Sequence, residues 1–235
     1  MHWGDVSFTD SGGTTRPLLF LHGTGCDSTD WSSVIDYLPS NQRYLTLDFR
    51  GHGKTSVPTQ SFSLHDLADD VIAIIDNQNI SEVILVGHSL GGMVAMRVAS
   101  RCVNVVGLIL LEGWTNLKSA GTAFDTDRFY GTLSPTEINR IKEKSEKTRS
   151  RFQPSIWKDF WSTVISFNGY NYLKEASIPI YEVFGEMGRN DATEDLLDIP
   201  SNPNIQVKWI SDAGHYLPHE RPMEVAEICN EYLTT

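Results

Sequence analysis

The feature that most constrains this chain is a serine between two glycines, placed where a strand-like run meets a helix-like run. Ser89 lies in G-H-S-L-G at residues 87–91, a G-x-S-x-G pattern. The pattern alone is common, but an apolar β-type run over 82–86 precedes it and a helical pattern over 90–99 follows it. This context predicts a sharp strand-to-helix turn that pushes the serine Oγ clear of the backbone. A Cβ at either flanking position would clash in so tight a turn, which explains the glycines.

Apolar β-rich runs alternate with helical patterns along the chain, which indicates an α/β fold with a mostly parallel sheet and helices on both faces. Several runs are almost uninterrupted hydrophobes, as expected of strands buried on both faces. Ser63 and Asp66 predict a capping-box start for a helix that runs to about Gln78. The predicted strands are Pro17–His22, Tyr44–Asp48, Glu82–Gly87, Val105–Glu112, Ile178–Gly185 and Ile205–Ser211.

The alternation breaks between Trp114 and Ala176, where an aromatic-rich stretch is expected to form loops and helices without strands. We interpret residues 114–176 as a helical cap inserted over the sheet edge, with residues 1–113 and 177–235 forming one core domain. The alternative is an ordinary packed helical layer whose aromatics serve only as core. Both interpretations can hold together, because a cap needs a core of its own as well as a lining.

Three more motifs accompany the serine turn, and their order along the chain is informative. H-G-T-G at 22–25 ends the first buried strand, D-F-R-G-H-G follows at 48–53, and G-H at 214–215 precedes Pro218 and E-R-P at 220–222. With G-H-S-L-G, these motifs resemble the α/β-hydrolase fold family over nearly the whole chain outside the 114–176 stretch. The resemblance implies a serine nucleophile, a histidine base and an acid, with no metal or organic cofactor. The sequence has no His/Cys cluster with zinc spacing and no dinucleotide-binding glycine pattern.

A serine hydroxyl is a poor nucleophile until a base takes its proton, and histidine is the usual base. Of seven histidines, His215 follows the last predicted strand in a turn from which its ring can reach Ser89. A developing oxyanion needs two backbone N–H donors. By resemblance these donors are Leu90, directly after the nucleophile, and Thr24, directly after the H-G pair.

The sequence leaves the acid of the triad open between two carboxylates. Most relatives carry an aspartate three residues past the glycine that ends the strand at Ile178–Gly185, but this chain has Gly188 there. Asp191 could serve if the loop carries an insertion, whereas Glu186 is a poorer geometric candidate. Glu112 ends an almost wholly apolar strand, where a carboxylate is costly unless paired. Some relatives use a glutamate at this second position, so Glu112 is preferred and Asp191 is the alternative.

These residues predict acyl transfer through an acyl-enzyme, with a small apolar carboxylic ester or lactone as the small-molecule substrate. Trp114, beside Glu112, is a candidate wall of the substrate pocket. A C–C hydrolase, a perhydrolase or an acyltransferase would use the same residues, because the fold and the triad do not separate these activities. A non-enzymatic small-molecule receptor is the rival from another class.

Composition excludes some partners and suggests a location. A formal net charge of −11 argues against nucleic acid or an anionic membrane surface, since both would repel the chain. No apolar run approaches the roughly 20 residues of a membrane helix, and no signal peptide is visible. Three cysteines are too few and too odd in number for a disulfide framework, so a cytoplasmic location is expected.

Overall fold

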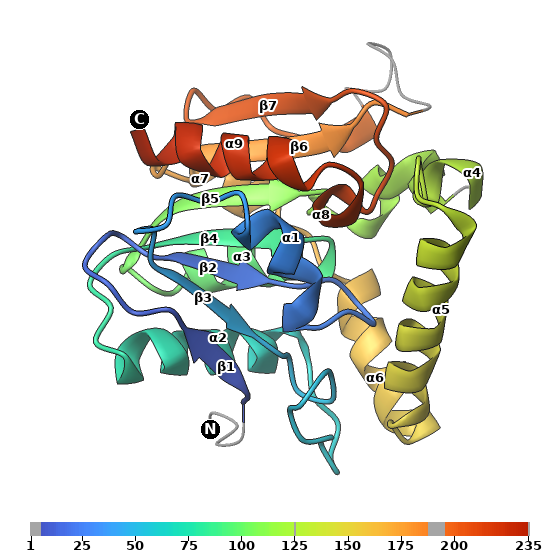
Figure 1. Cartoon of the computed structure of the whole chain (residues 1–235). Helices are drawn as coiled ribbons and strands as arrows, with labels where there is room; N and C mark the ends of the chain where they lie inside the picture. The colour runs from blue at the N-terminus through green and yellow to red at the C-terminus, as the bar shows by residue number, and fades with distance from the viewer. Residues whose placement is uncertain (1–5, 125, 188–195, 235) are drawn as a thin grey trace.

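A single seven-stranded sheet organises the molecule, in the order β1-β3-β2-β4-β5-β6-β7 (Figure 1). The structure is a computed structural model that describes residues 6–124, 126–187 and 196–234. Only β1 runs antiparallel to its neighbour, and the other pairs are parallel. The six strands predicted from sequence are confirmed, with ends shifted by one or two residues. The bounds are β1 Phe8–Asp10, β2 Leu18–Leu21, β3 Tyr44–Leu47, β4 Val83–His88, β5 Val105–Leu111, β6 Ile180–Gly185 and β7 Ile205–Ile210.

Helices cover both faces of the sheet, and alternate residues of each central strand bury against opposite layers. One core cluster joins one face of the strands to α2 (Leu64–Asn77) and α3 (Leu90–Ala99). The other joins the opposite face to α1 (Ser32–Ile35) and α9 (Pro222–Thr234). The predicted capping box is present at the start of α2. The Ser63 side chain accepts from the backbone N–H of Asp66, and the Asp66 side chain accepts from the backbone N–H of Ser63.

The edge strand β1 was not predicted, and its residues explain why. It is three residues long, and Phe8 and Thr9 are exposed. An exposed strand of this length has no hydrophobic periodicity to detect. Its place comes from pairing with β3, where Phe8 lies opposite Leu47.

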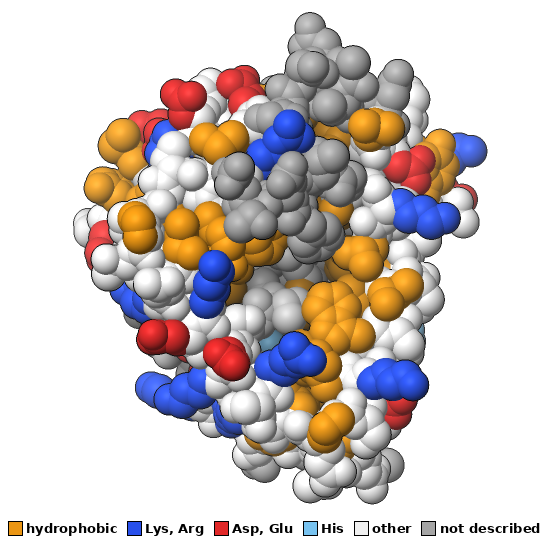
Figure 2. All heavy atoms as spheres, turned by 90° about the vertical axis from the view of Figure 1, so that its right-hand side faces the viewer, with side chains coloured by type: hydrophobic (Ala, Val, Ile, Leu, Met, Phe, Trp, Pro, Cys, Tyr) orange, Lys and Arg blue, Asp and Glu red, His pale blue; other side chains and the backbone are white. Residues whose placement is uncertain are grey.

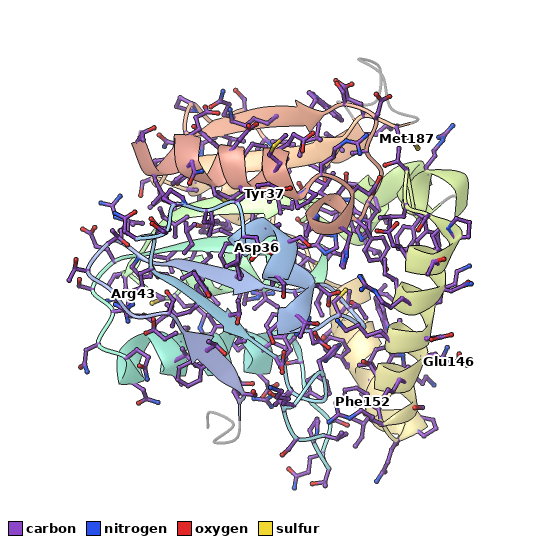
Figure 3. All side chains as sticks on the ribbon, viewed as in Figure 1. Asp36, Tyr37, Arg43, Glu146, Phe152 and Met187 are labelled. Atoms are coloured by element: carbon purple, nitrogen blue, oxygen red, sulfur yellow. The ribbon has the colours of Figure 1, made fainter. Side chains whose placement is uncertain are left out.

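Residues 114–176, here called the helical segment, contain no strand in their described part, only an isolated bridge between Asn116 and Asn168. Helices α4, α5 and α6 lie beside the carboxyl ends of the parallel strands (Figure 1). Between α5 and α6, Phe152 packs its ring against Gly51 and His52 of the core (Figure 3). The elements are η2 Leu117–Phe124, α4 Thr126–Phe129, α5 Pro135–Ser150, α6 Pro154–Ile165 and α7 Tyr170–Glu175. No helix in the described ranges has the length and hydrophobicity to cross a membrane.

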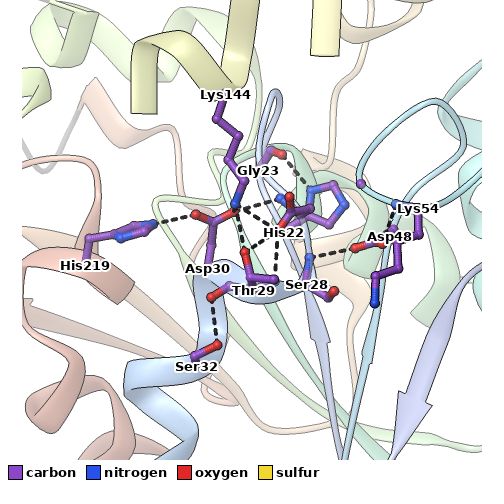
Figure 4. A network of polar contacts seen from close by, with 12 residues as sticks. His22, Gly23, Ser28, Thr29, Asp30, Ser32, Asp48, Lys54, Lys144 and His219 are labelled. Carbon is purple, nitrogen blue, oxygen red and sulfur yellow. Dashed lines mark hydrogen bonds and ion pairs between the residues drawn. The ribbon is translucent and has the colours of Figure 1, made fainter. Parts of the chain in front are cut away.

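A polar network fastens α5 to the loop after β2 (Figure 4). Lys144 Nζ donates to Asp27 Oδ1 at 2.8 Å and to Asp30 Oδ2 at 2.7 Å, and His219 Nε2 lies 2.9 Å from Asp30 Oδ1. Burial opposes ionisation of Asp30, but the His219 hydrogen bond and the Lys144 charge outweigh it and hold the pKa of Asp30 well below its usual range. The network therefore ties the helical segment to the core by charge as well as by packing.

Replacing Lys144 with methionine is expected to lower the free energy of unfolding by about 1–3 kcal/mol at pH 7, because Asp27 and Asp30 lose their shared cation. The depressed pKa of Asp30 means that its contribution is present above the unfolded-state pKa and is lost as the pH falls through the folded-state pKa. The loss of unfolding free energy caused by Lys144→Met should therefore be smaller in acid. Urea denaturation at pH 7 and at pH 3 measures both values. Lys147→Met, at an exposed position of the same helix, is the control. An equal loss of unfolding free energy in Lys144→Met and Lys147→Met would show that the ion pairs of Lys144 do not stabilise the protein.

Candidate active site

Ser89 sits in the strained turn that the motif predicts, between β4 and α3. Its backbone has φ 53° and ψ −116°, a conformation that side-chain-bearing residues rarely adopt. A Cβ on Gly87 would collide with the carbonyl of Gly91, and a Cβ on Gly91 would collide with the carbonyl of Leu21. The prediction that these glycines are sterically required is therefore confirmed.

The turn opens into a cavity of about 410 Å³ at the carboxyl ends of the strands. Figure 2 looks onto this side of the molecule and shows a hollow bordered by hydrophobic and basic side chains, with histidine atoms visible inside. The structure brings five of the predicted site residues together in the lining, from four separate parts of the chain. They are Thr24, Ser89, Leu90, Trp114 and His215.

The two residues predicted to supply the oxyanion donors, Thr24 and Leu90, line the cavity together with Ser89. Leu90 is the first residue of α3, so its N–H has no acceptor within the helix. Thr24 lies in a turn closed by a hydrogen bond from Cys26 N to Gly23 O at 3.2 Å. His22 shapes this turn, because its Nδ1 lies 2.8 Å from Gly23 O and its Nε2 accepts from Phe49 N at 3.0 Å. His22 therefore has a structural part in this turn.

Glu112 lies next to His215 in the interior, and both side chains are almost fully buried. Glu112 Oε2 is 3.7 Å from His215 Nδ1, which has no hydrogen-bond partner among the described residues. Trp114 Nε1 donates to the same Oε2 at 3.1 Å, and Gly185 N donates to Oε1 at 2.9 Å. Both donors hold the carboxylate beside the imidazole. At 3.7 Å, Glu112 Oε2 and His215 Nδ1 lie within ion-pair range but beyond hydrogen-bond length.

Two aromatic rings stack on the imidazole of His215. The Trp114 ring lies with its centroid 4.9 Å away at an angle of 29°, and the Phe129 ring lies 4.6 Å away at 11°. Trp114 is therefore more than the pocket wall that the sequence suggested, because it contacts both the histidine and Glu112. Phe129 belongs to α4 and Trp114 is the first residue of the helical segment, so this segment supplies both stacking rings.

His88, the variable residue of the G-x-S-x-G motif, contributes a contact that the sequence did not reveal. Its Nε2 lies 2.9 Å from the carbonyl oxygen of His215, and because a carbonyl only accepts, this nitrogen carries the proton. Burial and the nearby charge of His215 lower the pKa of His88 to about 3. A neutral His88 thus holds the backbone of the loop that carries His215.

Glu220 organises the same loop from the other side. Its carboxylate accepts from Gly214 N at 2.9 Å, from Tyr216 N at 3.0 Å and from Thr132 N at 3.0 Å. The backbone amides on both sides of His215 are therefore tied to one buried carboxylate. The E-R-P sequence after the histidine was the only signal for this role.

The remaining candidates for the acid lie elsewhere. Glu186 is exposed, and its Oε2 accepts from Ser211 Oγ at 2.8 Å. Asp191 and Gly188 lie outside the described residues. Within the described ranges no group of three or more His, Cys, Asp or Glu side chains could hold a metal ion.

Comparison with known proteins matches residues 18–228 to the model of the alpha/beta hydrolase family, which covers most of the chain. The chain belongs to the alpha/beta hydrolase family. The acetyltransferase component of the acetoin cleaving system of Pseudomonas putida is 31% identical over 94% of this alpha/beta hydrolase. A putative esterase/lipase of Haemophilus influenzae is 33% identical over 60% of it. The chain spans 63% of the first protein and 47% of the second, less than two thirds of either.

Solved structures give the same fold over the whole length of this alpha/beta hydrolase. Est816, described as an N-acyl homoserine lactone degrading enzyme, aligns with a TM-score of 0.72 at 26% identity, covering 97% of this chain and 96% of Est816. A thermophilic esterase from Thermogutta terrifontis aligns with a TM-score of 0.72 at 23% identity, covering 97% and 93% of the two chains. Homologues and structural neighbours of this chain thus include esterases and other hydrolases.

Proposed function

We propose that this alpha/beta hydrolase is a serine hydrolase that cleaves a small apolar carboxylic ester or lactone, with Ser89, His215 and Glu112 as its catalytic triad. One observation carries the proposal: a strained serine turn opens into a cavity that His215 also lines, while Glu112 lies behind that histidine. The similarity to esterases and to a lactone-degrading enzyme supports the substrate class.

In the proposed reaction, Ser89 Oγ attacks the carbonyl carbon while His215 takes the hydroxyl proton. The Thr24 and Leu90 amides stabilise the oxyanion of the tetrahedral intermediate. When the intermediate collapses, the ester C–O bond breaks and His215 returns the proton to the leaving alkoxide. Water then attacks the acyl-enzyme with the same proton transfers, which releases the acid and restores Ser89.

Glu112 fits the role of the acid by its position. Trp114 Nε1 and Gly185 N each donate to one oxygen of its carboxylate, and an anion beside Nδ1 stabilises the imidazolium of His215. In this proposal the helical segment acts as the cap. Its α5 and α6 supply lining residues such as Ile141, Trp161 and Val164, which give the cavity an apolar wall.

The proposal is tested by hydrolysis of p-nitrophenyl acetate, butyrate and octanoate, together with labelling by a fluorophosphonate that reacts with activated serines. We expect turnover and one label per chain on Ser89, because only this serine is activated by a base. Ser89→Ala should lose both. Ser145→Ala, which removes another serine of the cavity lining, should keep the label. Equal turnover by Ser89→Ala and the unmodified protein would refute the proposal.

A further inference from the structure

One side of the cavity is basic, although the chain as a whole is strongly acidic. The described lining residues include Lys142 and Arg149 of α5, against a formal net charge of −11 for the chain. Figure 2 shows basic side chains around the hollow. A local reversal of charge at the mouth of an otherwise apolar cavity concentrates ligands of opposite sign.

Neither cation is neutralised by a carboxylate within the described parts of the chain. Among the described residues, Lys142 Nζ lies 5.1 Å from the centroid of the Tyr130 ring and makes no ion pair. The guanidinium of Arg149 makes neither an ion pair nor a hydrogen bond with these residues. Lys144, on the same helix, differs because Asp27 and Asp30 hold it. No described carboxylate competes with a ligand for the charges of Lys142 and Arg149 by forming an ion pair with either.

Helix geometry puts these two cations on one flank of α5. Seven residues make about two turns, so Lys142 and Arg149 are offset by only about 20° around the helix. Ser145 lies on the inner side of this flank, where it contacts Gly25. Glu146 is about 40° further round on the outer side and is exposed (Figure 3). The side chains of Lys142, Glu146 and Arg149 are all exposed and line the cavity, so this flank carries two cations and one acid.

Aromatic contacts connect this flank to the reacting end of the cavity. Tyr130, which contacts Lys142, stacks on Tyr216 with centroids 5.6 Å apart and an angle of 3°. The Tyr216 ring lies 5.3 Å from that of His215. The rings of Tyr130 and Tyr216 therefore lie between Lys142 and the catalytic histidine, and an extended acyl chain can span this separation.

We propose that Lys142 and Arg149 form a subsite for a carboxylate of the substrate, so that the preferred ester carries a single negative charge remote from its scissile carbonyl. The inference rests on the proposed function and names its substrate class more closely. Two cations and Glu146 leave one net positive charge, which matches a monoanionic carboxylate better than a doubly charged phosphate.

The test compares kcat/KM for release of p-nitrophenol from two esters of suberic acid. The charged substrate is the mono-p-nitrophenyl ester, which has a free carboxylate at its far end. In the neutral substrate that carboxylate is a methyl ester on the same chain. Solvent-exposed ion pairs are worth little individually, so replacing both Lys142 and Arg149 with glutamine should lower the ratio of charged to neutral ester by about tenfold. Glu146→Gln should raise the ratio. Lys147→Gln, exposed on the same helix and absent from the lining, should leave it unchanged. An unchanged ratio in the double variant would overturn the subsite.

A binding measurement separates failure of the subsite from failure of the proposed function. Octanoate binding is followed by the fluorescence of Trp114 and Trp161, which line the cavity, and requires no turnover. The double variant should bind octanoate about tenfold more weakly than the unmodified protein, and equal affinity would reject the subsite. A protein that hydrolyses neither ester but shows this difference in affinity would retain the subsite and lose the proposed function.

Discussion

Glu112→Gln is expected to lower kcat for ester hydrolysis by about 10³- to 10⁴-fold, because the amide removes the negative charge that stabilises the His215 imidazolium. The surroundings make the loss severe. Trp114 and Gly185 each donate to a different oxygen of Glu112, so a glutamine must turn its NH₂ group toward one of the two donors. Steady-state kinetics on p-nitrophenyl butyrate measure the effect, with thermal unfolding to confirm that the variant folds.

The matched controls are the other two carboxylates of this region. Glu186→Gln should keep nearly full activity, because that side chain is exposed and bonds to Ser211. Asp191→Asn is the direct rival. A fully active Glu112→Gln beside an inactive Asp191→Asn would show that the acid has been assigned to the wrong residue.

The second large effect concerns stability and comes from Glu182, in the middle of β6. Its side chain is fully buried, and neither carboxyl oxygen has a hydrogen-bond partner among the described residues. Burial, with a smaller contribution from the charge of Glu112, raises the pKa of Glu182 to about 8. Glu182→Gln, a neutral isostere of the protonated acid, should therefore raise the free energy of unfolding by about 3 kcal/mol at pH 7.

The pH dependence gives this prediction its sign. A carboxyl whose folded-state pKa is raised contributes fully below its unfolded-state pKa, and stability is lost as the pH rises through the folded-state value. The gain from Glu182→Gln should be near zero at pH 4.5 and largest above pH 8. Glu175→Gln, at an exposed position, is the control. A gain that does not change with pH would rule out titration of Glu182 as its cause.

The sequence predicted the sheet and the serine turn because both depend on local patterns. Buried parallel strands need continuous hydrophobes, and the turn at Ser89 needs glycines on both sides, so neighbouring residues reveal both features. The contact between His215 and Glu112 joins residues 103 positions apart in sequence, and the parallel pairing of β5 with β6 and of β6 with β7 brings the ends of their strands together. The pairing of Glu112 with His215 was predicted from the resemblance to the α/β-hydrolase family and not from composition.

Other parts of the site had no readable signal. His88, the last residue of β4, acts through the carbonyl of His215, a contact that depends on how the loop after β7 packs against this strand end. Phe129 was one of many aromatics in the helical segment, and only the packing of α4 selects it for stacking on His215. Charges of both signs alternate along the sequence of α5, and only the position of the helix puts Lys142 and Arg149 beside the cavity.

The attachment of the helical segment to the histidine loop limits how this protein can be recombined with its relatives. Phe129 O accepts from His215 N at 3.3 Å, Thr132 N donates to Glu220 at 3.0 Å, and Arg221 donates to Thr132 Oγ1 at 3.1 Å. A chimera that exchanges residues 114–176 as one block would replace the helical-segment partner in all three bonds to the loop that carries His215. A graft that begins after Thr132 keeps these bonds. The part that can be exchanged is therefore α5 with α6, whereas residues 114–132 should be kept together with the core.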